Sequence, residues 1–319
     1  MQSFEERQVP DSPYNVSKSS AVKSLSIQHE LTSYSISNEV RQRCLSANLA
    51  LAVTFLDLQD LYHPQYFSDK ILTSRRSAYE FYKDRADLFF AISSFTKSSM
   101  VEKLGIEPDK IVVTYLAADD LSPLEQSAKA KKWCRQFGRF WLYPAKMWRH
   151  KNHEFLLRVL GRRAAELKNE KITMVLTGGF DEQDRAHLLK LITEANLNDI
   201  VEITGFVTDS QLQALMESAE FLFFPSLFEG FGMPVLEAMK RGCPVVVSKV
   251  GPLPEICGDA AVYFDPAQED ELISVVDLIL NNGGIQREEM IQKGYQNCQR
   301  FSWEKTFDKT VSAYSDVFG

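Results

Sequence analysis

The sequence has little of what several large classes of protein require. No apolar run approaches the ~20 residues that cross a bilayer. The net charge of −7 argues against a general nucleic-acid binder, because such proteins neutralise phosphates with a basic surface. Residues 1–10 are polar and acidic, unlike a secretory signal. We therefore expect a cytoplasmic protein with no nucleic-acid partner, and leave open peripheral contact with the inner membrane face or with a partner subunit.

Metal and cofactor motifs are also missing. The five cysteines are scattered and none has CxxC spacing, which argues against a zinc site and a disulfide framework: Cys44, Cys134, Cys243, Cys257 and Cys298. No DxD-type acidic pair accompanies a plausible metal pocket, and no GxGxxG fingerprint is present. We predict reduced, buried thiols, no metal and no bound cofactor.

What the chain does contain is a repeated alternation of apolar runs and helical patterns. The runs predict strands at 49–56, 88–92, 110–115, 140–143, 172–176, 201–203, 221–224, 245–247 and 261–264. Continuously apolar strands that alternate with helices indicate parallel sheets covered on both faces. The predicted fold class is α/β.

Composition and patterning divide the chain into four parts. Residues 1–48 are rich in Ser, Asn and Gln and are expected to form a polar, partly flexible lead-in that contributes no strand. Residues 49–122 carry about three strands and form a reduced first domain. Residues 123–300 carry six strands and form the second. Residues 301–319 form a final helix that packs back toward the first domain.

The segment from Glu229 to Glu237 has the chemistry of an anion site between two carboxylates. It follows a buried strand, and Pro234 suits the first turn of a helix because it has no N–H to leave unbonded. Loop amides and the helix dipole can receive a diphosphate, and Gly230 and Gly232 allow close approach of a ligand to the backbone. The plainer interpretation is a solvated loop acid at Glu229 and a dipole-compensating acid at Glu237.

Positive charge gathers after the strand at 140–143. Lys146, Arg149 and Lys151 follow that strand directly. The two lysines are suited to stabilise a leaving diphosphate, whose charge grows in the transition state. The alternative is a basic loop exposed to water, and His150 in it is more often a plain loop histidine than a proton carrier.

Two further strand ends provide candidate walls of the same site. One is glycine-rich but is only a weak indication of a cofactor site: Thr177-Gly178-Gly179. The other can offer backbone groups to a nucleotide base: Gly205-Phe206-Val207. Ligands of open parallel sheets bind at the carboxyl ends of strands, which is where both segments lie.

These residues together resemble the family 4 retaining glycosyltransferases. The resemblance is carried by Glu229-Gly-Phe-Gly-Met-Pro-Val-Leu-Glu237, Tyr143-Pro-Ala-Lys-Met-Trp-Arg-His-Lys-Asn152, Gly242-Cys-Pro-Val-Val246, Gly251-Pro-Leu-Pro-Glu255 and Phe301-Ser-Trp303. It is highly specific over about residues 140–317 and weaker from 52 to 119. It implies a GT-B fold, in which two Rossmann-like domains face a cleft, here with a reduced N-terminal domain.

The resemblance also implies a role for each motif residue. Glu229 would bind the hydroxyls of the donor sugar and Glu237 the nucleotide ribose, while Lys146 and Lys151 would hold the diphosphate. The other residues predicted to contact the nucleotide sugar are Gly178, Val207, Phe231, Gly232, Met233 and Leu236.

The implied reaction moves a hexose from a UDP-, GDP- or ADP-sugar to a glycan or lipid-linked acceptor. It would retain the anomeric configuration without a metal, by front-face attack in which the leaving phosphate helps to take the proton of the acceptor.

Two departures from the family pattern keep an alternative open. Residues 1–48 lack the usual glycine-containing first strand, and Leu56 stands where the family typically has a histidine that approaches the donor sugar. The alternative is a weak or inactive glycosyltransferase-like subunit that binds a sugar nucleotide and supports a partner. A nucleotide-sugar epimerase fits the paired glutamates less well.

Overall fold

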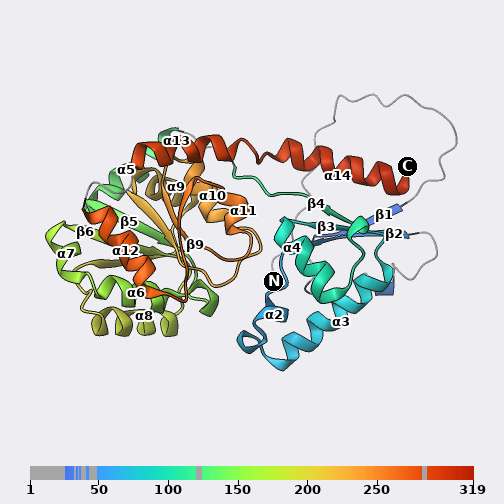
Figure 1. The fold of residues 1–319 in the computed structure, drawn as a ribbon, viewed down its shortest axis with the longest axis horizontal. Coiled ribbons are helices and arrows are strands. Elements are labelled where there is room, and N and C mark those ends of the chain that lie inside the picture. The colour runs from blue at the N-terminus through green and yellow to red at the C-terminus, as the bar shows by residue number, and fades with distance from the viewer. Residues whose placement is uncertain are drawn as a thin grey trace.

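The computed structural model describes residues 26–31, 34, 36, 41–42, 49–119, 124–281 and 286–319. Figure 1 shows two α/β domains side by side, with the last helix of the chain lying along one of them. All nine strands predicted from the apolar runs are present, although the third is shorter than predicted, at Ile111–Val113.

The N-terminal domain is built on a parallel sheet of four strands in the order β1-β2-β3-β4. The strands are β1 (Ser26–Glu30), β2 (Leu49–Phe55), β3 (Leu88–Ala91) and β4 (Ile111–Val113). The helices are α2 (Gln59–Tyr62), α3 (Asp69–Arg85) and α4 (Ser94–Ser99), the last continuing as a π-turn at Met100–Leu104. The core of this domain is buried between β2, β3 and α3.

The prediction that residues 1–48 contribute no strand is wrong. β1 pairs in parallel with β2, and Ser26 lies opposite Leu49. The strand was missed because Ser26-Ile-Gln-His-Glu30 is mostly polar, as suits an edge strand with one neighbour. His29 anchors it, since one ring nitrogen lies 2.8 Å from the hydroxyl of Thr54 and the other 2.6 Å from that of Tyr314.

The C-terminal domain has a parallel sheet of six strands in the order β10-β9-β8-β5-β6-β7. The strands are β5 (Arg139–Pro144), β6 (Ile172–Thr177), β7 (Val201–Gly205), β8 (Phe221–Phe224), β9 (Val245–Ser248) and β10 (Ala261–Phe264). All but the edge strand β7 are largely apolar, because helices cover both faces of the sheet.

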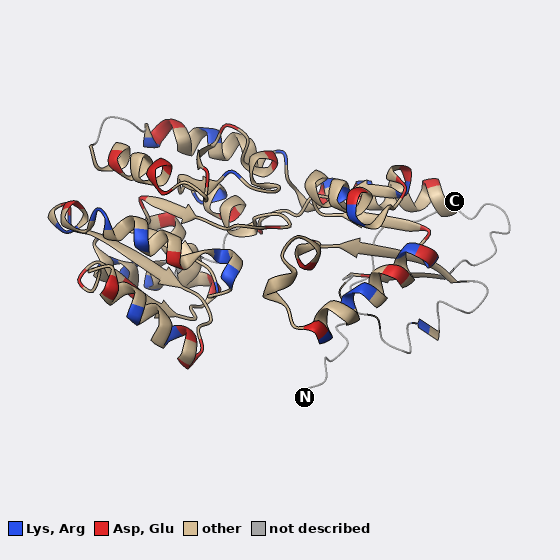
Figure 2. Ribbon diagram, turned by 60° about the horizontal axis from the view of Figure 1, so that its bottom comes forward, with Lys and Arg blue, Asp and Glu red and all other residues tan. Residues whose placement is uncertain are grey.

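The helices of this domain follow its strands in turn. They are α5 (Leu124–Cys134), α6 (His153–Gly161), α7 (Ala164–Asn169), α8 (Glu182–Glu194), α9 (Asp209–Ser218), α10 (Met233–Lys240), α11 (Leu253–Cys257), α12 (Glu269–Leu280) and α13 (Arg287–Cys298). Figure 2 shows that acidic and basic residues are interspersed along the outer helices of both domains. No helix among the described residues is long and apolar enough to span a membrane.

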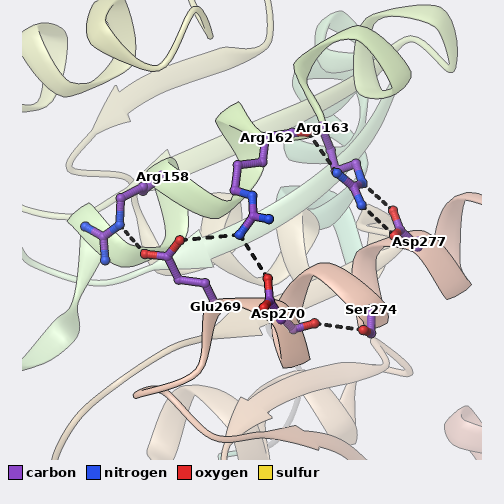
Figure 3. Close-up of polar contacts among 7 residues, drawn as sticks. All are labelled: Arg158, Arg162, Arg163, Glu269, Asp270, Ser274 and Asp277. Atoms are coloured by element: carbon purple, nitrogen blue, oxygen red, sulfur yellow. Dashed lines mark hydrogen bonds and ion pairs between the residues drawn. The ribbon is translucent and has the colours of Figure 1, made fainter.

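An ionic network joins α6 and its following turn to α12 on the surface of this domain. Arg163 donates two hydrogen bonds to Asp277, at 2.5 and 2.8 Å, and Arg162 and Arg158 contact Asp270 and Glu269 (Figure 3). Most of these side chains are substantially exposed, so each pair adds only about 0.2–1 kcal/mol. The network therefore links α12 to α6 but adds little to the stability of the domain.

The last helix, α14 (Trp303–Phe318), belongs to the N-terminal domain in space, as Figure 1 shows. Ser302 caps it by accepting the amide of Lys305. Ala313, Tyr314 and Phe318 pack on Ala52, Leu88 and Phe90 of the sheet. The chain therefore crosses between the domains a second time before it ends.

The two domains meet along an apolar seam. Ile92 of the N-terminal domain packs with Phe231, Leu236 and Ile256 of the C-terminal domain, and Phe301 joins them. Part of the loop that holds Gly230 and Gly232, here called the glycine loop, is thus buried against the opposite domain.

Candidate active site

The candidate site lies where the strand order of the C-terminal sheet reverses. The chain runs from β5 outward to β6 and β7, then returns to place β8 on the other side of β5. Ligands of such sheets bind at the carboxyl ends of the strands at this switch point, where the two adjacent loops diverge. The loop after β5 carries Lys146 and Lys151, and the loop after β8 carries Glu229.

Lys151 and Glu229 form an ion pair at this switch point. Lys151 Nζ lies 2.6 Å from Glu229 Oε1, and the side chains are only 14% and 11% exposed. Lys151 Nζ also lies 5.2 Å from the ring centroid of Phe224. A lysine has three N–H donors, so the pair leaves capacity on Lys151 for a phosphate oxygen.

Hydrogen bonds to backbone carbonyls fix the positions of the two loops. The amide of Leu227 donates to the carbonyl of His150 at 2.7 Å, and the Asn152 side chain donates to the carbonyl of Pro225 at 3.2 Å. The hydroxyl of Tyr143 donates to the carbonyl of Lys151. Lys151 is therefore positioned by β5 below it and by the β8 loop beside it.

Lys146 is exposed at the same edge, next to the glycines that follow β6. A β-carbon at Gly179 would lie 3.7 Å from Lys146 Cε, and Lys146 Nζ is 5.3 Å from the ring centroid of Trp148. A β-carbon at Gly178 would come within 2.5 Å of the carbonyl oxygen of Ala145. Gly178 is thus needed for close packing of the two loops, and the ligand contact predicted for it stays a prediction.

The glycine loop has two close approaches. A β-carbon at Gly230 would overlap the carbonyl oxygen of Leu56 and lie 2.9 Å from the Cβ of Asp57. Gly232 has a φ of 107° and precedes α10 as its N-cap, where Leu253 approaches closely. Phe231 between them is 3% exposed, so its side chain is packed inside the protein, and the backbone contact predicted for it stays a prediction.

Two neighbouring residues of α10 that were predicted to contact the nucleotide sugar, Glu237 and Leu236, differ in their surroundings. Glu237 is partly buried, and desolvation raises its pKa, assisted by Asp119 and Asp209 and opposed by the charge of Arg241. Leu236 is 1% exposed in the seam and its amide bonds the carbonyl of Gly232. The side chain of Leu236 is thus packed inside the protein. Met233 is half-buried, and the contacts with the nucleotide sugar predicted for both residues stay predictions.

The loop after β7 carries two neighbouring residues, Phe206 and Val207, that differ in exposure. Val207 is half-buried against the core of the domain, whereas the Phe206 ring is 84% exposed. An aromatic ring in water at the carboxyl edge of a sheet offers a stacking surface to a planar group. The base contact predicted for Val207 stays a prediction.

Three side chains that join the domains were not assigned roles from the sequence. Ser93 Oγ donates to the carbonyl of Gly230 at 2.8 Å, and Thr96 Oγ1 lies 3.3 Å from the same oxygen. Glu255 accepts the amides of Ser94 and Phe95, at 2.9 and 3.3 Å, and the hydroxyl of Tyr115 at 2.7 Å. Glu255 ends the Gly251-Pro-Leu-Pro-Glu255 segment that carries part of the family resemblance, but nothing in the sequence pointed to its contacts with the other domain.

Two histidines of the interface have depressed pKa values. Burial, with the charges of Lys151 and His63, lowers the pKa of His150 to about 3. Burial also lowers the pKa of His63, whose ring contacts Phe228. Both are neutral near pH 7. Across the described residues, no three His, Cys, Asp or Glu side chains are grouped to hold a metal ion, and metal independence stays a prediction.

Comparison with known proteins identifies the family. The family model of the glycosyl transferases group 1 matches residues 134–297, just over half of the chain. The chain belongs to this family. The match covers both loops of the candidate site, and the enzyme class expected from the motifs, glycosyltransferase, is confirmed.

Curated relatives of the glycosyltransferase chain are similar over different lengths. O-antigen chain mannosyltransferase B of Escherichia coli is 30% identical over 266 residues, which are 82% of this chain and 69% of that protein. MMP alpha-(1->4)-mannosyltransferase of Mycolicibacterium hassiacum is 38% identical over 132 residues, 39% of this chain and 31% of that protein. The chain thus spans about two thirds of the first relative and less than one third of the second.

Solved structures confirm the predicted α/β GT-B fold of this glycosyltransferase. Anabaena Alr3699/HepE in complex with UDP and glucose has a TM-score of 0.68 at 22% identity, over 84% of this chain and 72% of that one. Sucrose-phosphate synthase from Thermosynechococcus elongatus has a TM-score of 0.70 at 20% identity, over 88% and 70%. At these identities the likeness concerns the fold.

Proposed function

We propose that this glycosyltransferase moves a hexose, with mannose as the first candidate, from a nucleotide-diphosphate donor to a glycan or lipid-linked acceptor. Mannose is favoured because the two relatives described above carry mannosyltransferase names. A nucleotide-sugar donor is favoured because the Anabaena structure binds UDP and glucose. The reaction belongs to polysaccharide or glycoconjugate synthesis.

The Lys151–Glu229 pair at the switch point is the observation that carries this proposal. In the proposed complex, Glu229 accepts hydroxyls of the donor sugar while Lys151 keeps its bond to Glu229 and donates to the diphosphate. One cation then couples the position of the sugar to the charge of the leaving group. Since negative charge grows on the diphosphate as the bond to the anomeric carbon breaks, Lys151 stabilises the transition state more than the ground state.

The remaining residues have supporting roles in the proposed complex. Lys146 adds a second cation beside the diphosphate, and the backbone of Phe231-Gly232-Met233 faces its oxygens. Glu237 binds the ribose diol, and Gly178 and Val207 border the nucleotide. The leaving phosphate takes the proton of the acceptor hydroxyl, and the anomeric configuration is retained without a metal or other cofactor.

The test is a panel of UDP-, GDP- and ADP-linked hexoses, each incubated with purified protein and acceptor glycans, with and without excess EDTA. We expect one donor to be consumed with release of its nucleotide and to yield an elongated glycan whose new linkage keeps the donor's anomeric configuration by NMR. Loss of turnover on adding EDTA would refute metal independence, and an inverted linkage would refute retention.

Calorimetry on the same panel addresses the alternative of a binding subunit. Tight binding of one nucleotide sugar without release of nucleotide, in the presence of all acceptors, would favour the subunit over the enzyme. Absence of binding by every donor would refute both.

A further inference from the structure

Two cavities lie on either side of the loop that carries the predicted diphosphate lysines. One has a volume of about 560 Å³ and is bounded by the starts of α6 and α8. The other, of about 520 Å³, lies between this loop and the N-terminal domain. Each volume falls within the ~300–1,000 Å³ typical of small-ligand sites. They share Tyr66, Met147, Trp148 and Arg149 as walls, and these two neighbouring cavities together are here called the loop groove.

The second cavity is adjacent to the candidate active site. Its walls include Asp57 and His150. Asp57 adjoins Gly230, since a β-carbon there would lie 2.9 Å from the Cβ of Asp57, and His150 immediately precedes Lys151. The lining of the second cavity thus reaches residues that adjoin Gly230 and Lys151, whereas the lining of the first cavity includes neither Asp57 nor His150.

The walls combine aromatic faces with hydrogen-bonding groups. Trp148 is 56% exposed at the junction of the two cavities, with Tyr66 facing the same space. Asp57 and Gln59 line one cavity, and Glu154 and Gln183 the other. Aromatic rings offer apolar faces to the C–H groups of a sugar ring, and carboxylate and amide oxygens accept its hydroxyls.

Charge argues against a phosphorylated occupant of the loop groove. Arg75, a basic wall residue, donates to Asp60 at 2.9 Å and lies between the rings of Tyr34 and Phe67, at 4.1 and 4.6 Å from their centroids. Its charge is therefore already matched within the protein. Arg149 lines both cavities, together with Glu154 and Asp184 in one and Asp57 in the other, which leaves no excess of positive charge for a phosphate.

We propose that the loop groove binds an uncharged acceptor glycan of at least two sugar units, with Trp148 stacking at the junction between them. The terminal sugar occupies the cavity beside Asp57, and the preceding sugar occupies the cavity at the starts of α6 and α8. This inference rests on the proposed transferase function and specifies its acceptor. Because Trp148 lies between Lys146 and Lys151 in sequence, acceptor and diphosphate contacts share one loop.

The test measures glycan binding separately from transfer. Linear α-linked manno-, gluco- and galacto-oligosaccharides of one to four units are titrated into the wild-type protein by calorimetry. One series should bind, with affinity rising about tenfold from one unit to two. Trp148→Ala should remove most of that gain while nucleotide-sugar affinity stays within about threefold of wild type. Phe307→Ala on α14, which removes another exposed aromatic ring outside the groove, should bind all lengths as wild type does.

The outcomes separate this proposal from the transferase function. Affinity independent of chain length, equal effects of the two variants, or no binding by any oligosaccharide would overturn the loop groove as a glycan site. If length-dependent binding is lost in Trp148→Ala but no donor is ever consumed by the wild type, the groove stands and the transferase function fails. Because Trp148 is more than half exposed, its variant should keep the wild-type melting temperature.

Discussion

Gly230 lies so close to Leu56 that no side chain fits between the two domains at this point. A β-carbon on Gly230 would overlap the carbonyl oxygen of Leu56, and the Gly230 carbonyl in turn accepts the hydroxyl of Ser93 at 2.8 Å. Leu56 occupies the position where the family typically has a histidine. In this chain the backbone carbonyl of Leu56, rather than a side chain, makes the contact with Gly230. This contact fixes the peptide that directly follows Glu229.

Gly230→Ala should therefore separate the domains and slow transfer. The added methyl group must displace either Leu56 or the glycine loop by about 1 Å, and displacements of that size cost on the order of 100-fold in rate. We expect a lower transfer rate and a larger radius of gyration by small-angle X-ray scattering. Gly294→Ala in α13 is the matched control, because its β-carbon would meet Met239 at an ordinary 3.4 Å. Equal rates for the two variants would mean that the Leu56 contact is unimportant.

Lys151→Ala and Glu237→Ala should each weaken nucleotide-sugar binding by about tenfold or more. The first removes a cation from the diphosphate and leaves Glu229 without its partner at 2.6 Å. The second removes the carboxylate assigned to the ribose. Lys168→Ala, which breaks an exposed pair with Asp199, controls for loss of a positive charge. Unchanged affinity in both site variants by calorimetry would show that the assigned pocket is wrong.

The apolar runs predicted every strand of the C-terminal sheet, and most clearly the four inner ones, because strands buried on both faces carry their signal locally. β1 escaped prediction because its stability depends on residues remote in sequence. His29 is held by Thr54 and by Tyr314, which is 285 positions away. The same limit applies to the site. The loops of Lys151 and Glu229 could be predicted from strand ends and glycines, whereas the loop groove joins Asp57 to His187 across both domains.

His153 should make the protein sensitive to acid. Burial, with the charge of Lys151, lowers its pKa from 6.5 to about 4 in the folded state. The unfolded chain therefore binds more protons between these values, and stability falls as the pH drops from about 6.5 to about 4. The shift corresponds to roughly 3 kcal/mol. Well above pH 6.5 the histidine is neutral in both states and contributes no pH dependence.

Urea unfolding between pH 4 and 7 checks this expectation. His153→Phe keeps a ring against Tyr143, whose centroid is 4.6 Å away, and should lose stability less steeply in acid than the wild type. His187→Phe on α8 changes an exposed histidine and should follow the wild type. Parallel curves for wild type and His153→Phe would assign the acid sensitivity to other groups.

Glu255 should hold the two domains together through its hydrogen bonds. Its carboxylate accepts two amides at the start of α4 and the hydroxyl of Tyr115, and hydrogen bonds to a charged group are worth about 1.5–3 kcal/mol each. Glu255→Ala leaves those donors to water, which opens the interface while the core of each domain stays intact. We expect a lower transfer rate and little change in the melting temperature, and Glu289→Ala on α13 should alter neither.

A double-mutant cycle tests whether Glu255 acts through its hydrogen bond with Tyr115. Tyr115→Phe removes one of the three bonds to Glu255, at 2.7 Å, and keeps the ring that packs on Phe301. If the two side chains work together, Tyr115→Phe should slow transfer in the wild type but have no further effect in Glu255→Ala. Additive losses would mean that the Tyr115 hydroxyl supports the site independently of Glu255, through the hydroxyl of Ser94, which lies 3.2 Å from it.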